Sequence, residues 1–363
     1  MSNPLLQVPW ETCLLEPVQD RALARQLKRE AGAAPAWSRY FWISPWFAKA
    51  AIRLEWANGV LVELDFDIAI LIALVVSREN SCRYCYATVR AMMRMLGLDE
   101  VRVLAIEAEL AGGQLDARRD AVVHFARAVN RGHRIDGRAL RERLLLAGFA
   151  PDEVREIAYV VVAMGFMNRM TTIAALSPAS WERAPDRWIV RLLKPVLPTV
   201  LKRMMKRGQP ATLPVADSPL SARLLACYDR SPIQAVLADS VRDLWASDGL
   251  PQRTKLLMLA TIAQGIGCDV CAQEMARLAA AAGFEFDTLD RAAAHLDDPG
   301  LDASERELCE FARESLWYEP QQIQRKARAV CERIGKPAFV EAIAVAAFGN
   351  LLMRLTAAMV DPE

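Results

Sequence analysis

Histidine is the scarcest reactive residue in this chain. Only three occur among 363 residues, and His124, His133 and His295 all stand far along the sequence from the paired cysteines described below. Histidine is the usual general base near neutral pH, because its ordinary pKa is about 6.5. The sequence therefore places no histidine beside its candidate nucleophiles.

An excess of one charge is also missing. Lysine and arginine total 45, aspartate and glutamate total 44, and the formal net charge is +1. A nucleic-acid-binding protein is normally strongly basic, so this balance argues against a nucleic-acid partner.

Long hydrophobic runs are absent as well. The longest, Ile68–Val76 and Ile157–Met167, are shorter than the ~20 residues that a membrane-spanning helix needs. The segment Met1–Trp10 lacks the charged start and apolar core of a signal peptide. We therefore expect no membrane span and a cytoplasmic, reducing location.

What the sequence does contain is a Cys-x-x-Cys motif in two copies. Cys82 and Cys85 form the first, Cys268 and Cys271 form the second, and the other four cysteines are scattered. Two cysteines at this spacing at the start of a helix lie close enough for a disulfide, and the positive end of the helix dipole favours the thiolate. This pattern favours redox chemistry.

Two other interpretations of the cysteines remain open. A structural zinc site needs about four ligands, so both motifs would have to meet in space. Buried cysteines can also act simply as small hydrophobic residues.

The 186-residue spacing between the motifs recurs along the chain. The repeated pairs include Gly97 with Gly283 and Phe125 with Phe311 at 186 residues, and Arg169 with Arg354 at 185 residues. A nearly constant spacing over so many positions indicates internal duplication.

Each half is predicted to be helical. Apolar residues recur at three- and four-residue spacings in 104–110, 117–130, 134–146 and 154–176, and no period-2 strand series occurs. The predicted fold class is all-α. The expected divisions are a lead-in at 1–36, a first repeat at 37–180, a basic linker at 181–213 and a second repeat at 214–363.

These features resemble the carboxymuconolactone decarboxylase and alkylhydroperoxidase D superfamily. The resemblance covers nearly all of both halves. It is carried by the apolar helix before each Cys-x-x-Cys, the Phe-Ala-Arg stretch, the Leu145–Phe149 turn and the Asn168-Arg169 ending. It implies two tandem alkylhydroperoxidase D-like helical repeats that form a pseudo-dimer, and assembly as a homo-oligomer.

The resemblance also implies an activity. In peroxidase members of that family the cysteine pair reduces a hydroperoxide, cycles through a disulfide and is restored by a thiol electron donor, without metal or organic cofactor. The second cysteine usually attacks. That implies Cys85 and Cys271 as the attacking thiolates, and Cys82 and Cys268 as the resolving cysteines.

Two residues that accompany the cysteine pair in that family are missing from this chain. The family has a histidine four residues after the second cysteine, where this chain has Val89 and Met275. It has a glutamate twelve residues before the first cysteine, where this chain has Ile70 and Leu256. Without a base, a thiol is only a few per cent ionised at neutral pH, so peroxidase activity should be slow.

Several residues are candidate substitutes for the missing pair. In the first half these are Tyr84, Glu79 and Asp67, and in the second half Glu274, although each is more often a solvated or capping residue. Arg83 would stabilise a thiolate in the first motif, whereas Asp269 would oppose one in the second. The first half is therefore the favoured site.

The predicted function is that of a thiol-based peroxidase or disulfide oxidoreductase, acting on a hydroperoxide or disulfide in an antioxidant role. The alternative is a non-catalytic binding or assembly protein that kept the fold but lost the histidine and glutamate. A lactone decarboxylase-like enzyme is a third hypothesis, for which no residue set is visible.

Four further features are predicted to be structural. His124 is expected to be a core or interface histidine, and Arg169 and Arg354 to pair with Glu156 and Glu341. The basic segment 187–207 is interpreted as a linker with solvated charges rather than a membrane-surface helix. The aromatic cluster is expected in the core or at a subunit interface: Trp37, Tyr40, Phe41, Trp42, Trp46 and Phe47.

Overall fold

The computed structural model describes residues 4–362 except 56, 58, 111, 113–114, 179–221, 284–290, 292–293 and 297–298. Every regular element within these residues is a helix, and the prediction of an all-α fold is confirmed. The whole linker predicted at 181–213, with its basic segment 187–207, lies outside the described residues.

The N-terminal half holds two short 3-10 helices and a series of α-helices. They are η1 Pro4–Gln7, α1 Arg21–Glu30, η2 Ala36–Phe41, α2 Pro45–Leu54, α3 Phe66–Glu79, α4 Arg83–Met95, α5 Glu100–Leu110, α6 Ala117–Arg131, α7 Gly137–Leu146 and α8 Pro151–Ile173.

The described helices of the C-terminal half follow the same order. They are α12 Ala222–Cys227, α13 Pro232–Ala246, α14 Gln252–Ile266, α15 Asp269–Ala281, α17 Ala303–Glu314, α18 Pro320–Ile334 and α19 Lys336–Met359. Residues 83 and 269, which begin α4 and α15, are 186 apart, and residues 151 and 336, which begin α8 and α19, are 185 apart.

The ends of equivalent helices are built alike. Gly97 follows the last turn of α4 and Gly283 follows that of α15, with φ angles of 104° and 75°. A residue with a Cβ rarely adopts such angles, so glycine suits both helix ends. At the start of α6 and α17, the side chains of Asp116 and Asp302 accept backbone N–H groups three residues on.

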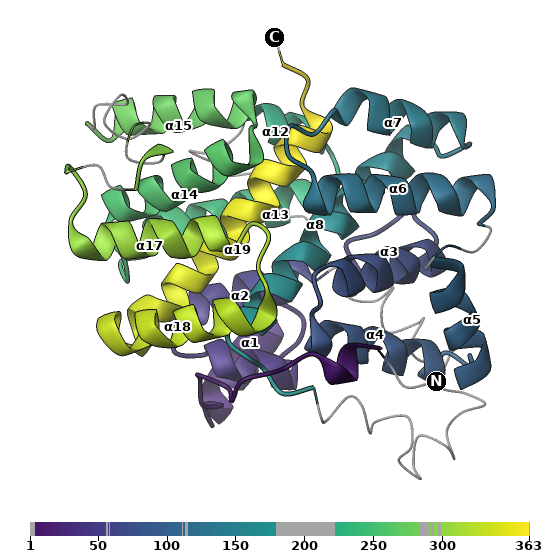
Figure 1. Ribbon diagram of the computed structural model, residues 1–363, viewed down its shortest axis with the longest axis horizontal. Coiled ribbons are helices and arrows are strands. Elements are labelled where there is room, and N and C mark those ends of the chain that lie inside the picture. Colours follow the sequence, from purple (N-terminus) through teal and green to yellow (C-terminus); the bar gives the residue numbers. More distant parts are fainter. Residues whose placement is uncertain are drawn as a thin grey trace.

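The long helices α8 and α19 cross at the centre of the molecule and pack along each other (Figure 1). Figure 1 places α3–α7 on one side of them and α14, α15, α17 and α18 on the other. α19 is long and apolar enough to cross a membrane, but 94% of its apolar window is buried inside the protein. That burial is typical of a core helix.

Packing partners recur in the two halves. α3 packs on α4, α6 and α8, and α14 packs on α15, α17 and α19. Contacts between the halves are reciprocal, because α7 packs on α19 while α18 packs on α8.

The aromatic cluster belongs to the core. Phe41 and Phe47 are fully buried, and the Phe47 ring lies 6.1 Å from that of Phe166 on α8 and 6.2 Å from that of Phe348 on α19. These rings join η2 and α2 to the crossing of the central helices. His124, in contrast, is exposed on α6, so it is not a core residue, and its prediction as an interface histidine stays a prediction.

The predicted ion pairs between Arg169 or Arg354 and a glutamate are also wrong. Glu156 accepts the backbone N–H groups of the loop at residues 62–64, at 2.7–3.0 Å. Glu341 accepts the N–H groups of Gly249 and Leu250 and pairs with Lys255 at 2.8 Å. Both carboxylates therefore hold the loop before α3 or α14, because free N–H groups in a buried loop need acceptors.

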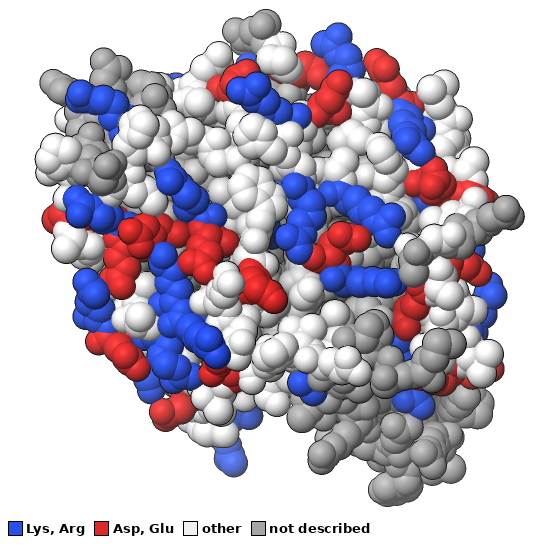
Figure 2. Space-filling view, in the orientation of Figure 1, with Lys and Arg blue, Asp and Glu red and all other residues white. Residues whose placement is uncertain are grey.

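The surface carries charges of both signs. On the face drawn in Figure 2, basic and acidic side chains are interspersed, and no large patch of one sign is visible. This distribution matches the balanced composition.

Candidate functional site

The first cysteine pair lies at the turn from α3 into α4. Cys82 is the N-cap of α4, and its sulfur accepts the backbone N–H of Cys85 at 3.3 Å. This N–H is one of those left free at a helix start, and it adds to the positive end of the helix dipole. Both cysteines are free thiols, and their exposed fractions are 0% and 3%.

Thr171 on α8 joins the two sulfurs. Its Oγ1 lies 3.3 Å from the sulfur of Cys82 and 3.2 Å from that of Cys85. The same hydroxyl donates to the carbonyl oxygen of Met167 at 2.8 Å. Either atom of each contact between sulfur and Oγ1 can be the donor, so the hydroxyl hydrogen can turn from Met167 to a sulfur when that sulfur is a thiolate.

A buried amide network stands beside the pair. The side chain of Asn80 donates to those of Asn130 and Asn168 at 3.0 and 3.1 Å, and Asn130 donates back to Asn80 at 3.1 Å. All three are buried, so the neighbourhood of the first pair is polar although it is closed to solvent.

The two thiols differ in acidity. Burial would raise the pKa of Cys82, but hydrogen bonds from Cys85, including its backbone N–H, and from Thr171 outweigh burial and lower that pKa below its ordinary value. Burial and then the neighbouring Cys82 raise the pKa of Cys85 well above its ordinary value. The Cys82 sulfur also accepts the Cys85 backbone N–H at the start of α4, so the geometry favours Cys82 as the thiolate, whereas the family resemblance implies Cys85.

The C-terminal half contributes Tyr318 to this site. Burial, followed by the charge of Cys82, raises the pKa of Tyr318 well above its ordinary value, and Cys85 adds to the effect. The hydroxyls of Tyr318 and of Thr172 are buried and have no hydrogen-bond partner among the described residues. The Arg169 guanidinium lies 5.9 Å from the Tyr318 ring, and burial lowers the pKa of Arg169 to about 10.

The second cysteine pair has the same backbone geometry. Cys268 is the N-cap of α15, and its sulfur accepts the Cys271 N–H at 3.3 Å. Here the two sulfurs form a disulfide, and the sulfur of Cys271 lies 3.6 Å from the carbonyl oxygen of Met353.

The surroundings of the two pairs differ. At the repeat spacing, the positions of Asn80, Asn130 and Asn168 are taken by Ile266, Leu316 and Met353. The second pair therefore lacks the amide network of the first. The first half, which carries this network, is also the half that the sequence favours as the site.

The candidate substitutes for the missing histidine and glutamate lie in different surroundings. Tyr84 is buried in α4 beside Cys85. The Glu79 carboxylate accepts from Arg127 Nε at 3.1 Å, and Asp67 is exposed near the start of α3, about 18 Å along that helix from its end beside Cys82. The structure thus brings neither Glu79 nor Asp67 to the thiols. Glu274 pairs with Arg277 at 2.7 Å.

The zinc interpretation required both motifs to meet. Figure 1 shows α4 and α15 on opposite sides of the central helices α8 and α19. Within the described residues, no group of three or more histidine, cysteine, aspartate or glutamate side chains is placed to hold a metal ion.

Comparison of the chain with protein-family models, with curated proteins and with solved structures finds no match in any of the three. The alkylhydroperoxidase D-like resemblance therefore rests on the residues themselves.

Sequence reasoning missed Thr171, Tyr318 and the asparagine network. Thr171 carried one signal, because Thr356 occupies its place in the second half at the 185-residue spacing. Tyr318 carried none, since it lies in the other half of the chain and reaches the first site only through the fold.

Proposed function

We propose that this chain is a thiol–disulfide redox protein of the alkylhydroperoxidase D-like class, working at Cys82 and Cys85. The observation that carries the proposal is the shared contact of both sulfurs with Thr171 Oγ1, at 3.3 and 3.2 Å. This contact holds two thiols of unequal acidity together within a polar, buried setting. Two thiols held in this way are suited to forming a disulfide between them.

The reaction with a hydroperoxide follows from these roles. The Cys82 thiolate attacks the terminal oxygen, the O–O bond breaks, and the leaving alkoxide takes a proton to become an alcohol. The Cys85 sulfur then attacks the oxidised Cys82 sulfur, loses its proton and releases water as the disulfide forms. An external dithiol restores both thiols, and each cycle transfers two electrons.

Two residues support this chemistry. The Thr171 hydroxyl lies against both sulfurs of the reduced pair. The Tyr318 hydroxyl is buried without a partner among the described residues, and burial and the charge of Cys82 raise its pKa, so it is a neutral hydrogen-bond donor within electrostatic reach of the thiols. Thr171 and Tyr318 together partly replace the missing histidine and glutamate.

We further propose that the chain is a tandem pseudo-dimer in which only the first half is catalytic. The recurring helix starts, packing partners and glutamate-held loops support the duplication. The apolar surroundings of Cys268 and Cys271 support a structural disulfide there. Assembly as a homo-oligomer and a cytoplasmic location stay predictions.

The test is consumption of a small alkyl hydroperoxide with dithiothreitol as donor. Cys82→Ser and Cys85→Ser should each abolish the protein-dependent rate, and Tyr318→Phe should lower it while leaving the fold intact. Cys271→Ser is the matched control and should keep the rate of the wild type. Equal rates in all five proteins would reject the proposal.

A non-catalytic binding or assembly role is the second candidate. The observation that favours it is the burial of both thiols, with Val89 buried where the related family has histidine. It predicts thiols that a labelling reagent reaches only on unfolding. Rapid labelling of Cys82 in the native protein would exclude this role.

A further inference from the structure

A pocket of about 380 Å³ opens between α3, α4, α5 and α6, away from the cysteines. This volume falls within the ~300–1,000 Å³ typical of small-molecule sites. Aliphatic side chains and Met93 make most of its wall, among them Ile70, Leu71, Leu74 and Ile106. An apolar wall of this size indicates that an apolar ligand group fits inside.

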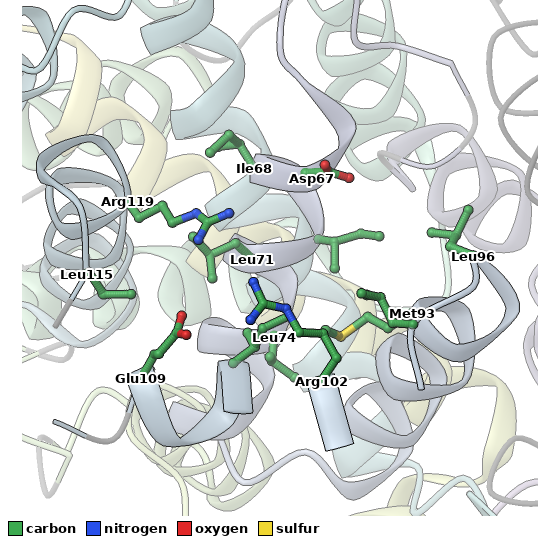
Figure 3. Close-up of a pocket in the computed structure, with 13 residues that line it drawn as sticks. Asp67, Ile68, Leu71, Leu74, Met93, Leu96, Arg102, Glu109, Leu115 and Arg119 are labelled. Carbon is green, nitrogen blue, oxygen red and sulfur yellow. The ribbon is translucent and has the colours of Figure 1, made fainter. Parts of the chain in front are cut away.

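The mouth of the pocket is charged. Figure 3 shows the guanidinium groups of Arg102 and Arg119 pointing toward the middle of the pocket, near Leu71. Glu109 lies on the same rim, whereas the Asp67 carboxylate points away from the two arginines. Two cations against one nearby carboxylate leave this part of the mouth positive.

Neither arginine is strongly engaged by the protein. Arg102 has no ion pair or side-chain hydrogen bond among the described residues, and Arg119 reaches Asp116 at 3.5 Å on the exposed surface. Their donors are therefore available to an anion. Guanidinium groups bind carboxylates well, because their paired N–H donors match the two oxygens.

Two of the pocket's positions are bridged in the second half. At the repeat spacing, Asp67 and Arg119 correspond to Arg253 and Glu305, which form a salt bridge at 2.8 Å. The first half has the same two positions with the signs exchanged, but no ion pair within 4.0 Å joins Asp67 to Arg119. Among the described residues, the ion pair at these two positions is thus made in the second half and not in the first.

We propose that this pocket binds an amphipathic monocarboxylate, such as a medium-chain fatty acid. The carboxylate lies between Arg102 and Arg119, and the hydrocarbon chain runs along Leu71 and Leu74 toward Met93. The proposal does not depend on redox activity at Cys82 and Cys85.

Decanoate is the probe, with binding measured by titration calorimetry on the full chain. Arg102→Ala and Arg119→Ala should each weaken decanoate binding by about tenfold or more, as expected for the loss of a charge-assisted hydrogen bond. Decanol, with the same chain but no charge, should bind at least about tenfold more weakly than decanoate. Glu109→Gln should tighten decanoate binding, because it removes the opposing charge.

Arg138→Ala is the matched control, since it removes an exposed arginine of α7, an element that contributes no residue to the pocket. Its decanoate affinity should equal that of the wild type. Because Arg102 and Arg119 are both exposed, their variants should fold normally, which circular dichroism checks. No decanoate binding at ~1 mM, or equal affinity in the Arg102, Arg119 and Arg138 variants, would overturn the proposal.

Discussion

Arg169 and Arg354 make reciprocal contacts across the centre of the molecule. Arg169 Nε donates to the carbonyl oxygen of Ser315 at 2.9 Å, and Arg354 Nη1 donates to that of Val129 at 2.9 Å. Val129 and Ser315 are 186 residues apart, and the two arginines are 185 apart. Each half thus gives the other the same contact that it receives, as in an isologous dimer interface.

Replacing either arginine should destabilise the protein. Both are buried, and both donate to the carbonyl oxygen of Leu316, at 3.0 Å from Arg169 and 3.3 Å from Arg354. Arg169→Ala leaves buried carbonyl groups without donors and should lower the free energy of unfolding by about 3 kcal/mol in urea denaturation. Arg354→Ala should lower the free energy of unfolding by a similar amount.

The double variant adds a sharper check. Because the arginines share the Leu316 carbonyl, their effects should not be additive in a double-mutant cycle. Additive losses, or a large loss from one arginine alone, would contradict the reciprocal arrangement.

Thr171 should control the acidity and the rate of the first pair. Thr171→Val removes the hydroxyl beside both sulfurs and should slow peroxide-driven disulfide formation by about tenfold, equivalent to about one pKa unit. Thr171→Ser should restore most of the rate. Thr356→Val removes the equivalent hydroxyl in the second half and should leave the rate unchanged, as measured by stopped-flow thiol titration.

The pH dependence follows from the lowered pKa of Cys82. In a variant that keeps Cys82 and Cys85 as its only free thiols, the first thiolate to form as pH rises should appear at a lower pH in the folded protein than in the unfolded chain, as measured by ultraviolet thiolate absorbance. A pKa lowered by folding adds stability above the unfolded pKa, and this stability is lost as pH falls through the folded value. A Cys82 midpoint at or above that of the unfolded chain would refute the assignment of the nucleophile.

The second pair should contribute stability and not turnover. A disulfide that closes so short a loop contributes about 2 kcal/mol in the chain-entropy model. The Cys268→Ser and Cys271→Ser double variant should therefore lose about that much unfolding free energy and keep the hydroperoxide rate of the wild type. A rate reduced by half or more would assign a catalytic role to the second half.

The sequence predicted the helices well because their apolar periodicity and capping residues are local. It also located both cysteine turns, since the 186-residue spacing is visible without a structure. It did not find the partners of Glu156 or Glu341, because those partners are backbone N–H groups, which every residue except proline carries. Nor could it place Tyr318, whose position depends on how one half packs against the other.

The most direct test of the central claim is to map disulfides after oxidation. The fully reduced protein is treated with an equimolar alkyl hydroperoxide, alkylated and analysed by mass spectrometry. The account predicts a Cys82–Cys85 disulfide, one hydroperoxide consumed for each disulfide formed there, and full reversal by dithiothreitol. Recovery of Cys82 and Cys85 as alkylated thiols, with the hydroperoxide unconsumed, would contradict it.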